Sequence, residues 1–428
     1  MAVEEYPFSE LLSVVIDNRG KTCPTADSGI PLIATNCIRN ELLYPTYDKV
    51  RFVSRETYSN WFRGHPLPGD IIFVNKATPG RVCLVPDPVD FCIAQDMVAV
   101  RADPKRVYPN YLLAVLRSPA VQEKIGQMHV GTLIPHFKKG DFDKLLLPIP
   151  ERKTQEFIGD AYFALSAKID LNRRMNATLE AMARALFQSW FVDFDPVRAK
   201  LDGRKPIGLD ETTAALFPDS FQESALGEIP HGWRFGTLGE LVQLRTDRVD
   251  ATPAKDSTRY IALEDMPSKS IDLSNFQLGS AVNSSITAFR KGDVLFGSMR
   301  PYFHKVGLAF FDGITRTTTF VLRPRKDCFR HFALLHFFSD DVVAHTTTAS
   351  VGTTIPYVRW DSMESYRIPI PPDALLAAFE KTVSPFIQRI AAQGEESRTL
   401  ATLRDTLLPK LLSGELSMTA NLLASTKS

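Results

Sequence analysis

Two short segments of the sequence gather basic and aromatic side chains that could contact nucleic acid. They are VNKATPGR at 74–81 and SMRPYFHK at 298–305, and each is followed along the chain by a GT-x-IP motif, at 131–135 and 352–356. Arginine can read guanine through two parallel hydrogen bonds, whereas lysine mostly meets phosphate. A solvated surface charge or a turn residue is at least as common at any single one of these positions. The candidate contacts are Lys76, Arg81, Thr132, His136, Lys138 and Lys139 in the first half and Arg300, Tyr302, His304, Lys305, Thr353, Tyr357 and Arg359 in the second.

Acidic residues and histidines do not form a pattern that predicts catalysis or a metal site. Asp193 and Asp195 in FVDFDP could suggest a metal pair, but loop residues past a helix end, with Asp195 extended before Pro196, are the commoner reading. The eight histidines include no HExxH motif, and His331 and His336 have the wrong spacing for a shared helical face. The sequence also lacks a G-x-x-x-x-G-K-[ST] phosphate loop and the (N/D)-P-P-(Y/F) tetrad of amino-methyltransferases. We therefore expect no catalytic residue, metal or cofactor in this chain.

Length and composition describe a multidomain protein with little overall charge. The 428 residues exceed one ordinary domain, and 44% apolar with 23% charged residues is typical of globular proteins. Fifty Lys and Arg against 49 Asp and Glu leave a net charge of +1, so nucleic-acid binding would need basic residues on one face or a partner that neutralises phosphate. Five scattered cysteines, two consecutive glutamates at positions 4 and 5 and no long apolar run favour a cytoplasmic protein without signal peptide or membrane span.

The chain contains an internal duplication. PGDIIF at 68–73 matches KGDVLF at 291–296, and LPIP at 147–150 matches IPIP at 368–371. The GT-x-IP and P-I-P motifs keep one offset, because 352 − 131 and 368 − 147 both equal 221. Earlier segments match more loosely, so each half consists of a variable block followed by a better-matched one.

Each variable block has the pattern of a mixed α and β domain. In the first, DIIFVN and MVAVRA predict short strands, and 108–128 predicts one or two helices broken near Pro119. In the second, DVLFGSM and TTFVLRP predict strands, and FALLHFFSDDVVAHT predicts a helix.

After each P-I-P motif, apolar residues recur at alternating spacings of three and four over more than thirty residues, which predicts a long helix with a coiled-coil seam. A helix of about 35 residues spans roughly 50 Å at about 1.5 Å per residue. Two such helices side by side would hold the variable domains well apart. The predicted seam positions are Leu165, Ile169, Asn172, Asn176, Leu179, Leu186 and Trp190 in the first helix and Phe386, Ile390, Gln393, Ser397, Leu400, Leu407 and Leu411 in the second.

Both predicted seams are polar near their middles, at Asn172 and Asn176 and at Gln393 and Ser397. If the helices pair antiparallel, these residues face each other and fix the register at some loss of stability. The alternative is that each helix packs only on its own domain. The stripe is too long for the face of a small domain, so we favour pairing.

The segment between the halves, rich in Pro, Gly and Asp, carries the most specific motifs. SWFVDFDPVRAK at 189–200, ALFPDSF at 215–221 and LGEIPHGW at 226–233 closely resemble the central region of Type I restriction-modification DNA-specificity subunits. LRDTLLPKLLSGEL at 403–416 resembles their distal region, and the duplicated P-I-P motif followed by a long helix is also that family's plan. The first half lacks a clear LGEIPxGW motif, so the start of its recognition domain could be trimmed.

The resemblance implies an α+β fold with a tandem duplication of a mixed α/β target-recognition domain. Each domain would be followed by a long helix, and the two helices would pair as an antiparallel coiled coil. The expected segments are a first recognition domain at 1–150, a first helix at 151–191, an ordered linker at 192–232, a second recognition domain at 233–372, and a second helix with a C-terminal tail at 373–428.

The resemblance also implies partners. Each recognition domain would read one half of a split site in double-stranded DNA, and the helices would dock two adenine-N6 methyltransferase subunits. ATP-driven restriction subunits would join that core, so S-adenosylmethionine, ATP and Mg are implied for partner subunits and not for this chain. Two rival hypotheses remain: an enzyme in its own right, and a scaffold whose duplicated domains bind proteins, which the near-neutral charge favours.

Overall fold

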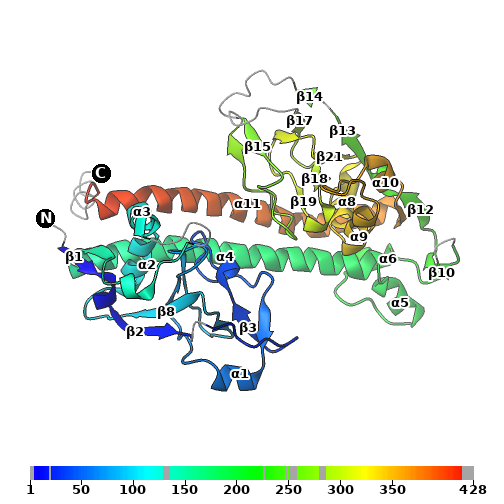
Figure 1. Cartoon of the computed structure of the whole chain (residues 1–428). Coiled ribbons are helices and arrows are strands. Elements are labelled where there is room, and N and C mark those ends of the chain that lie inside the picture. The colour runs from blue at the N-terminus through cyan, green and yellow to red at the C-terminus, as the bar shows by residue number, and fades with distance from the viewer. Residues whose placement is uncertain are drawn as a thin grey trace. The chain divides into compact units, whose positions relative to one another are not determined.

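The computed structural model describes residues 4–18, 21–128, 135–224, 227–246, 248–249, 258–278 and 286–416. The chain divides into two compact units, residues 1–171 with 399–428 and residues 172–398. Two helices of 40 residues each, α4 (Arg152–Phe191) and α11 (Asp373–Leu412), contribute one part to each unit (Figure 1). Each unit has hydrophobic clusters of its own.

The main sheet of the first unit has four antiparallel strands in the order β2-β8-β5-β6. Its inner strand β5 reads IIFV and is buried at all four residues, as expected for a strand covered on both faces. A smaller sheet has the order β4-β3-β7, with β3 parallel to β7, and β1 pairs antiparallel with β9. The bounds are β1 (Glu4–Pro7), β2 (Leu12–Asp17), β3 (Ile30–Ile33), β4 (Arg51–Val53), α1 (Arg55–Asn60), β5 (Ile71–Val74), β6 (Val82–Leu84), β7 (Cys92–Ile93), β8 (Met97–Ala102) and β9 (Leu146–Ile149).

Two helices follow β8 and meet at Pro119. They are α2 (Pro109–Arg117), which contacts β6 and β8, and α3 (Pro119–Met128). Proline lacks an amide hydrogen, so it ends the hydrogen-bond ladder of α2 and fits the first turn of α3. The Ser118 hydroxyl between them donates to the Val115 carbonyl oxygen at 2.7 Å. The predicted break near Pro119 is therefore confirmed.

The second unit repeats this topology and confirms the duplication. Its main sheet has the order β13-β21-β18-β19, its strands β15 and β20 are parallel like β3 and β7, and β12 pairs with β22 as β1 does with β9. The bounds are β12 (Arg234–Thr237), α7 (Leu238–Leu241), β13 (Val242–Arg245), β14 (Arg248–Val249), β15 (Arg259–Ile261), β16 (Gln277–Leu278), β17 (Ile286–Phe289), β18 (Val294–Gly297), β19 (Val306–Leu308), β20 (Gly313–Arg316), β21 (Thr319–Pro324), α8 (Arg330–Phe337), α9 (Asp340–Thr348), α10 (Trp360–Glu364) and β22 (Arg367–Ile370).

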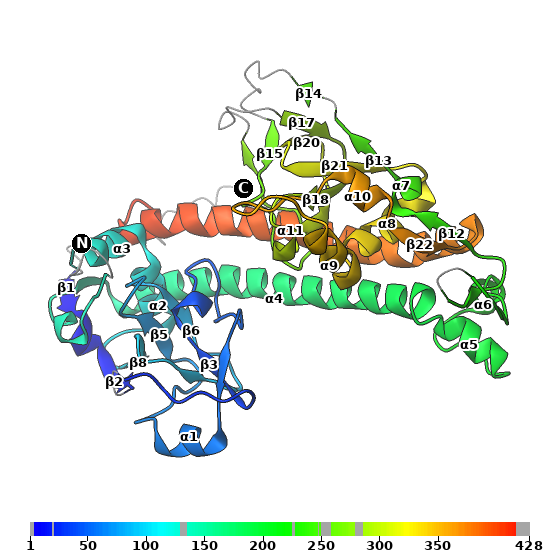
Figure 2. The same ribbon diagram turned by 45° about the vertical axis from the view of Figure 1, so that its right-hand side comes forward.

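Helix α8 joins the sheet of the second unit to the long helices (Figure 2). It contacts β18 and β19. On its other side, the ring of Phe332 lies 4.8 Å from the ring of Phe191 in α4, measured between centroids, and Phe379 of α11 lies 4.8 Å from the same ring. The core of this unit is thus built by its sheet and by both long helices together.

The segment 192–232 is folded within the second unit. It holds α5 (Asp195–Leu201), α6 (Glu211–Ala215) and the pair of short strands β10 (Phe221–Gln222) and β11 (Ile229–Pro230). The ring of Phe217 lies 5.2 Å from Trp190, edge to face.

Asp195 begins α5, and Pro196 lies in the first turn of this helix. The expectation of an extended Asp195 is therefore wrong. Proline is well tolerated in the first turn, because the amides there have no partner within the helix. Among the described residues, no helix combines the length and apolar character needed to cross a bilayer.

In each half, the aspartate of the matching motifs PGDIIF and KGDVLF forms a buried ion pair. Asp70 accepts hydrogen bonds from Nε and Nη2 of Arg101 at 2.7 and 2.9 Å, and Asp293 accepts the same two from Arg323 at 2.8 Å each. Each carboxylate also accepts the backbone amide three residues before it, at 2.8 Å, which closes the turn that precedes the strand. The Asp side chains are 1% and 3% exposed, so each buried charge is fully paired.

Replacing Asp293 with asparagine should destabilise the second unit, because Arg323 would lose its buried carboxylate partner. We expect the free energy of unfolding to fall by about 2–4 kcal/mol, measured by urea titration of the full chain. Glu211→Gln is the control, since its ion pair with Lys205 joins side chains 97% and 93% exposed and should not affect stability measurably. Equal effects of the two substitutions would contradict the role given to Asp293.

Candidate nucleic-acid interface

In the first unit, the loop that leaves β5 is fastened to the segment that follows the GT-x-IP motif. The backbone amide of Phe137 donates to the Asn75 carbonyl oxygen at 2.8 Å, and the Asn75 side-chain amide donates to the Phe137 carbonyl oxygen at 3.0 Å. The amide of Ala77 donates to the Pro135 carbonyl oxygen at 3.0 Å. Two candidate segments that are distant in the sequence therefore lie side by side, with Lys76 bridged to His136.

The second unit builds the same arrangement at the equivalent positions. The amide of Val358 donates to the Ser298 carbonyl oxygen at 2.9 Å, and the amide of Arg300 donates to the Pro356 carbonyl oxygen at 2.7 Å. Met299 is bridged to Tyr357 as Lys76 is to His136. We call each of these pairs of segments a paired loop: 75–81 with 135–139 in the first unit, and 298–305 with 351–359 in the second.

Both paired loops contain a residue other than glycine in the left-handed backbone region at the equivalent position. Ala77 has a φ of 69° and Arg300 a φ of 49°. A side chain at such a φ is strained, and here the strained residue is the one whose amide is bonded to the proline carbonyl. The hydrogen bond thus holds an unfavourable backbone conformation at the tip of each loop.

Most candidate contacts of the first unit lie at the surface. Lys76, Arg81, Lys138 and Lys139 are exposed and His136 is half-buried, whereas Thr132 lies outside the described residues. Lys76 and Lys139 form loose ion pairs with Asp96 at 4.0 Å and Asp17 at 3.6 Å. Exposed pairs of this kind contribute little, so the ammonium groups remain available to a stronger anion.

The candidate contacts of the second unit divide into exposed and internal residues. Arg300, Tyr302, Thr353, Tyr357 and Arg359 are exposed. Lys305, by contrast, is half-buried and donates from Nζ to the Leu263 carbonyl oxygen at 2.6 Å, and burial lowers the pKa of its ammonium group.

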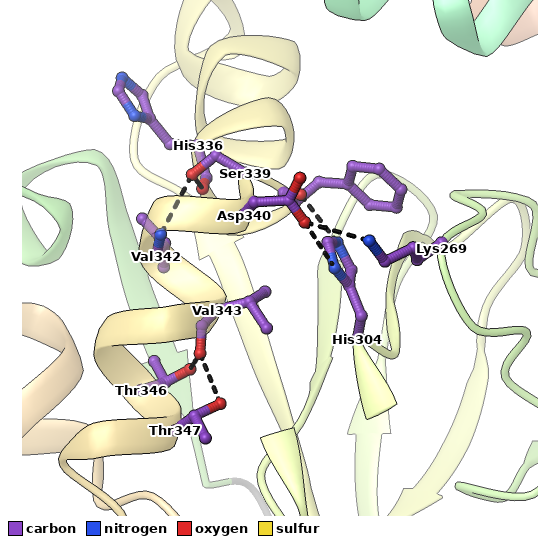
Figure 3. Close-up of polar contacts among 10 residues, drawn as sticks. Lys269, His304, His336, Ser339, Asp340, Val342, Val343, Thr346 and Thr347 are labelled. Carbon is purple, nitrogen blue, oxygen red and sulfur yellow. Dashed lines mark hydrogen bonds and ion pairs between the residues drawn. The ribbon is translucent and has the colours of Figure 1, made fainter. Parts of the chain in front are cut away.

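His304 is inside the second unit, which corrects its place among the candidate contacts. Its side chain is 5% exposed, its Nε2 lies 2.8 Å from the Phe338 carbonyl oxygen, and burial lowers its pKa. Figure 3 shows the imidazole and Lys269 directed at the Asp340 carboxylate, with Nδ1 at 3.5 Å and Nζ at 3.3 Å. The short helical turn at Pro301–Phe303, ending in a left-handed His304, turns the ring inward.

The paired loop of the second unit also exposes apolar side chains that the sequence analysis did not include. Phe303, Val351 and Ile355 are 40%, 37% and 45% exposed, next to Tyr302 at 51% and Tyr357 at 41%. Such side chains can contact thymine methyl groups and sugars. In the sequence, the adjacent aromatic residues Tyr302 and Phe303 were the signal that could have identified Phe303 as an exposed contact.

Replacing Ala77 with glycine should stabilise the first unit, because glycine adopts the left-handed conformation without strain. We expect a gain of about 0.5–1 kcal/mol in the free energy of unfolding, measured by urea titration. Ala164→Gly on the exposed side of α4 provides the opposite control and should cost about 1 kcal/mol. A loss of stability in Ala77→Gly would show that the loop does not hold Ala77 in this conformation.

Within the second unit, the polar residues of the two long helices meet. The Asn172 side-chain amide donates to Oε2 of Glu396 at 2.9 Å and to Oγ of Ser397 at 3.2 Å, and the Asn176 amide donates to the Ile390 carbonyl oxygen at 3.3 Å. From Asn172 to Asn176 along α4, the contacted residue on α11 moves back from Ser397 to Ile390. The two helices therefore run antiparallel in this unit. The side-chain amide of Gln393 contacts the sulfur of Met175 at 3.4 Å.

The predicted seam positions are all turned at least partly away from solvent. In the second unit Asn172, Asn176, Trp190, Ile390 and Gln393 are buried, and Leu179, Leu186, Phe386 and Ser397 are half-buried. In the first unit Leu165, Ile169, Leu400, Leu407 and Leu411 are half-buried. There Arg404 of α11 lies over the ring of Tyr162 in α4, with 5.6 Å from Cζ to the centroid.

A loop of the second unit packs against both long helices within that unit. Glu180 of α4 accepts a hydrogen bond from Oγ of Ser270 at 2.7 Å, and Asp272 accepts one from Asn176 at 3.2 Å. On α11, a Cβ at Gly394 would lie 1.8 Å from Oγ of Ser274, so only glycine permits this approach. Burial raises the pKa of Glu180 to about 7 and also raises that of Asp272. Among the described residues, no three His, Cys, Asp or Glu side chains are placed to share a metal ion.

Glu180 should make the stability of the second unit depend on pH. Because its folded pKa of about 7 exceeds the ordinary value of 4.5, the folded unit keeps a proton that the unfolded chain releases, and stability falls as pH rises through this window. Glu180→Gln should match the wild type near pH 5 and exceed it at pH 8 by roughly 1–3 kcal/mol in the free energy of unfolding.

Urea titrations of both proteins between pH 5 and 8 measure this difference. Asp272 remains in both proteins, and its raised pKa acts on stability in the same direction in each. Glu223→Gln, at an exposed position of the same unit, is the control and should differ from the wild type by the same amount at every pH. A pH-independent difference for Glu180→Gln would refute the assignment.

Comparisons with known proteins agree with this duplicated arrangement. The family model described as Type I restriction modification DNA specificity domain matches residues 18–181 and 230–390. The chain is 26% identical over 402 residues to the Type I restriction enzyme HindI specificity subunit of Haemophilus influenzae, covering 81% of this chain and 86% of that protein. It is 23% identical over 366 residues to the MjaIX specificity subunit of Methanocaldococcus jannaschii, covering 81% and 78%. The solved S subunit of a Type I system from M. genitalium shares the fold, with a TM-score of 0.53 at 15% identity over 96% of each chain.

Proposed function

This chain belongs to the family of Type I restriction-modification DNA-specificity subunits, and we propose that each of its two units reads one half of a divided DNA site. The observation that carries this proposal is the paired loop, built twice through the same main-chain hydrogen bonds at equivalent positions and exposing basic side chains both times. Arg81 and Arg300 are the residues we assign to base contacts, because arginine can donate two hydrogen bonds to guanine. The exposed lysines of the first unit would contact phosphate and position the protein.

We propose that α4 and α11 set the distance between the half-sites. Each is continuous over 40 residues, which corresponds to roughly 60 Å at about 1.5 Å per residue. Half-sites on the same face of B-DNA lie one helical turn apart, about 34–36 Å, or a multiple of it. A continuous helix is stiff enough to specify such a spacing, which a flexible linker would not be.

We further propose that the long helices dock methyltransferase subunits, which carry out the chemistry. Helix α4 exposes large apolar side chains in both units, Phe157 and Leu171 in the first and Met175 and Met182 in the second. Exposed apolar side chains at helical spacing favour a partner helix. S-adenosylmethionine would be bound by these partners, and ATP with Mg by restriction subunits. The scaffold hypothesis without DNA is not favoured, because the family is one of DNA-specificity subunits.

The test is to express the chain with its neighbouring methyltransferase subunit in a host without DNA methylation and to map N6-methyladenine across the genome. We expect a divided motif that disappears when this chain is omitted. Arg300→Ala should weaken the base preference in one half of the motif, and Arg81→Ala should weaken it in the other half. We expect each to lose about 1–3 kcal/mol of discrimination at the base concerned.

Arg389→Gln, at an exposed position of α11 outside both paired loops, is the matched control and should leave the motif unchanged. Methylation that does not depend on this chain would refute the specificity role for this pair of subunits. A motif that depends on the chain but is relaxed in both halves by one substitution would refute the assignment of one half-site to each unit.

A further inference from the structure

In each unit, a two-residue turn joins the main sheet to a second sheet. Residues 95–96 connect β7 to β8 in the first unit, and residues 317–318 connect β20 to β21 in the second. The two turns hold equivalent places in the duplication, because β7 pairs in parallel with β3 as β20 does with β15, and each turn then enters the main sheet. We call residues 94–96 and 316–318 the third segment of their units.

The third segment is bonded to the paired loop through one carbonyl oxygen. In the first unit, the Asp96 carbonyl oxygen accepts the amides of Asn75 at 2.9 Å and Lys76 at 3.2 Å. In the second unit, the Thr318 carbonyl oxygen accepts the amide of Ser298 at 3.0 Å and its hydroxyl at 2.7 Å. Because the carbonyls of Asn75 and Ser298 are bonded to the other side of the paired loop, three segments lie in a row, with the loop that leaves the central strand in the middle.

This row of three segments matches the width of a DNA groove. Hydrogen-bonded segments lie about 4.8 Å apart, so three of them span about 10 Å, and the major groove of B-DNA is about 12 Å wide. Successive base pairs are about 3.4 Å apart, so the row extends over about three of them. The third segment therefore adds contacts beside those of the paired loop.

Buried polar atoms without partners gather along the row. In the first unit, Oδ1 of Asn75, Oγ1 of Thr78 and Oε1 of Gln95 are buried and have no hydrogen-bond partner among the described residues. In the second unit, Oγ1 of Thr319, directly after the third segment, is in the same situation. Buried polar atoms are nearly always hydrogen-bonded, so exceptions at one place indicate a functional site.

The side chains of the third segment differ between the two units. In the first unit Gln95 is half-buried, and rotation about its last side-chain bond exchanges the two ends of its amide. In the second unit Arg316 and Thr317 are exposed. An amide can form two hydrogen bonds with adenine, and a guanidinium can form two with guanine. Equivalent positions thus present different hydrogen-bonding patterns.

We propose that the third segment belongs to the recognition surface of each unit, with Gln95 reading adenine in one half-site and Arg316 reading guanine in the other. This inference rests on the proposed function and adds a contact segment to it. The main-chain bonds of Asp96 and Thr318 hold both segments at the same place, so a difference of side chain at this place becomes a difference of base preference.

The experiment maps N6-methyladenine produced by the full chain with its methyltransferase partner, for the wild type, Gln95→Ala and Arg316→Ala. We expect Gln95→Ala to lose its preference for adenine at one position, and Arg316→Ala its preference for guanine at one position of the other half, each about tenfold or more. Since the segments lie side by side, these positions should differ from those affected by Arg81→Ala and Arg300→Ala.

Two matched controls keep the residue type and change its place. Gln127→Ala alters an exposed glutamine of α3. Arg290→Ala alters an exposed arginine directly after β17, and β17 runs antiparallel to β20, so Arg290 lies at the opposite end of this strand pair from Arg316. Both variants should produce the wild-type motif, and thermal unfolding of every variant tests its folding.

Gln95→Glu separates base reading from a supporting role. It keeps the shape of the side chain but can only accept hydrogen bonds, so the preference should change from adenine to cytosine at the same position. A supporting role would leave the identity of the base unchanged.

An unchanged motif in Gln95→Ala and Arg316→Ala, beside altered motifs in Arg81→Ala and Arg300→Ala, would overturn this inference and leave the proposed function intact. A lowered unfolding temperature with less methylation of an unchanged motif would also overturn it, because the third segment would then only support the fold. Methylation that does not depend on this chain would overturn both.

Discussion

A buried carboxylate bonded to a guanidinium on the next strand determines the position of the central strand in each unit. Asp70 and Asp293 stand at the start of β5 and β18 and hold Arg101 of β8 and Arg323 of β21. A shift of one residue along the neighbouring strand would unpair a buried charge and turn the apolar residues to the wrong face. The far end of the same strand carries the first segment of the paired loop. The place where that loop emerges therefore follows from an ion pair at the other end of the strand.

The sequence was sufficient to predict the duplication and the long helices, because both leave local signals. Two motif pairs with one offset predicted two similarly folded halves, and the main four-stranded sheets of the two units have equivalent strand orders. The spacing of apolar residues after the P-I-P motifs predicted helices from 151 and from 373, and α4 and α11 begin at Arg152 and Asp373. If the helices paired antiparallel, their polar middles were expected to face each other, and a hydrogen bond of 3.2 Å joins Asn172 to Ser397 in the second unit.

Contacts of the loops with distant segments left no such signal. The matching motifs were recognised, but nothing in their spacing indicated that the loop after β5 would pair with the segment after the GT-x-IP motif, since pairing is decided by the sheet between them. Residue type suggested a surface role for His304, and only the backbone of the Pro301–Phe303 turn shows that its ring points inward. In the sequence, Glu180 looks like an ordinary charged residue on a helix face. In the structure its carboxylate accepts a hydrogen bond from Ser270, which lies 90 residues away.

The paired loops are fastened largely through main-chain atoms, and this has a consequence for how the protein can evolve. The amides of Ala77 and Arg300 bond to the proline carbonyls whatever side chains they carry, and the bridged pairs differ between the halves, Lys76 with His136 and Met299 with Tyr357. A main-chain attachment survives most substitutions at the exposed positions of the loops. New sequence preferences can therefore arise by single substitutions without a new fold, and each half of one polypeptide is free to diverge from the other.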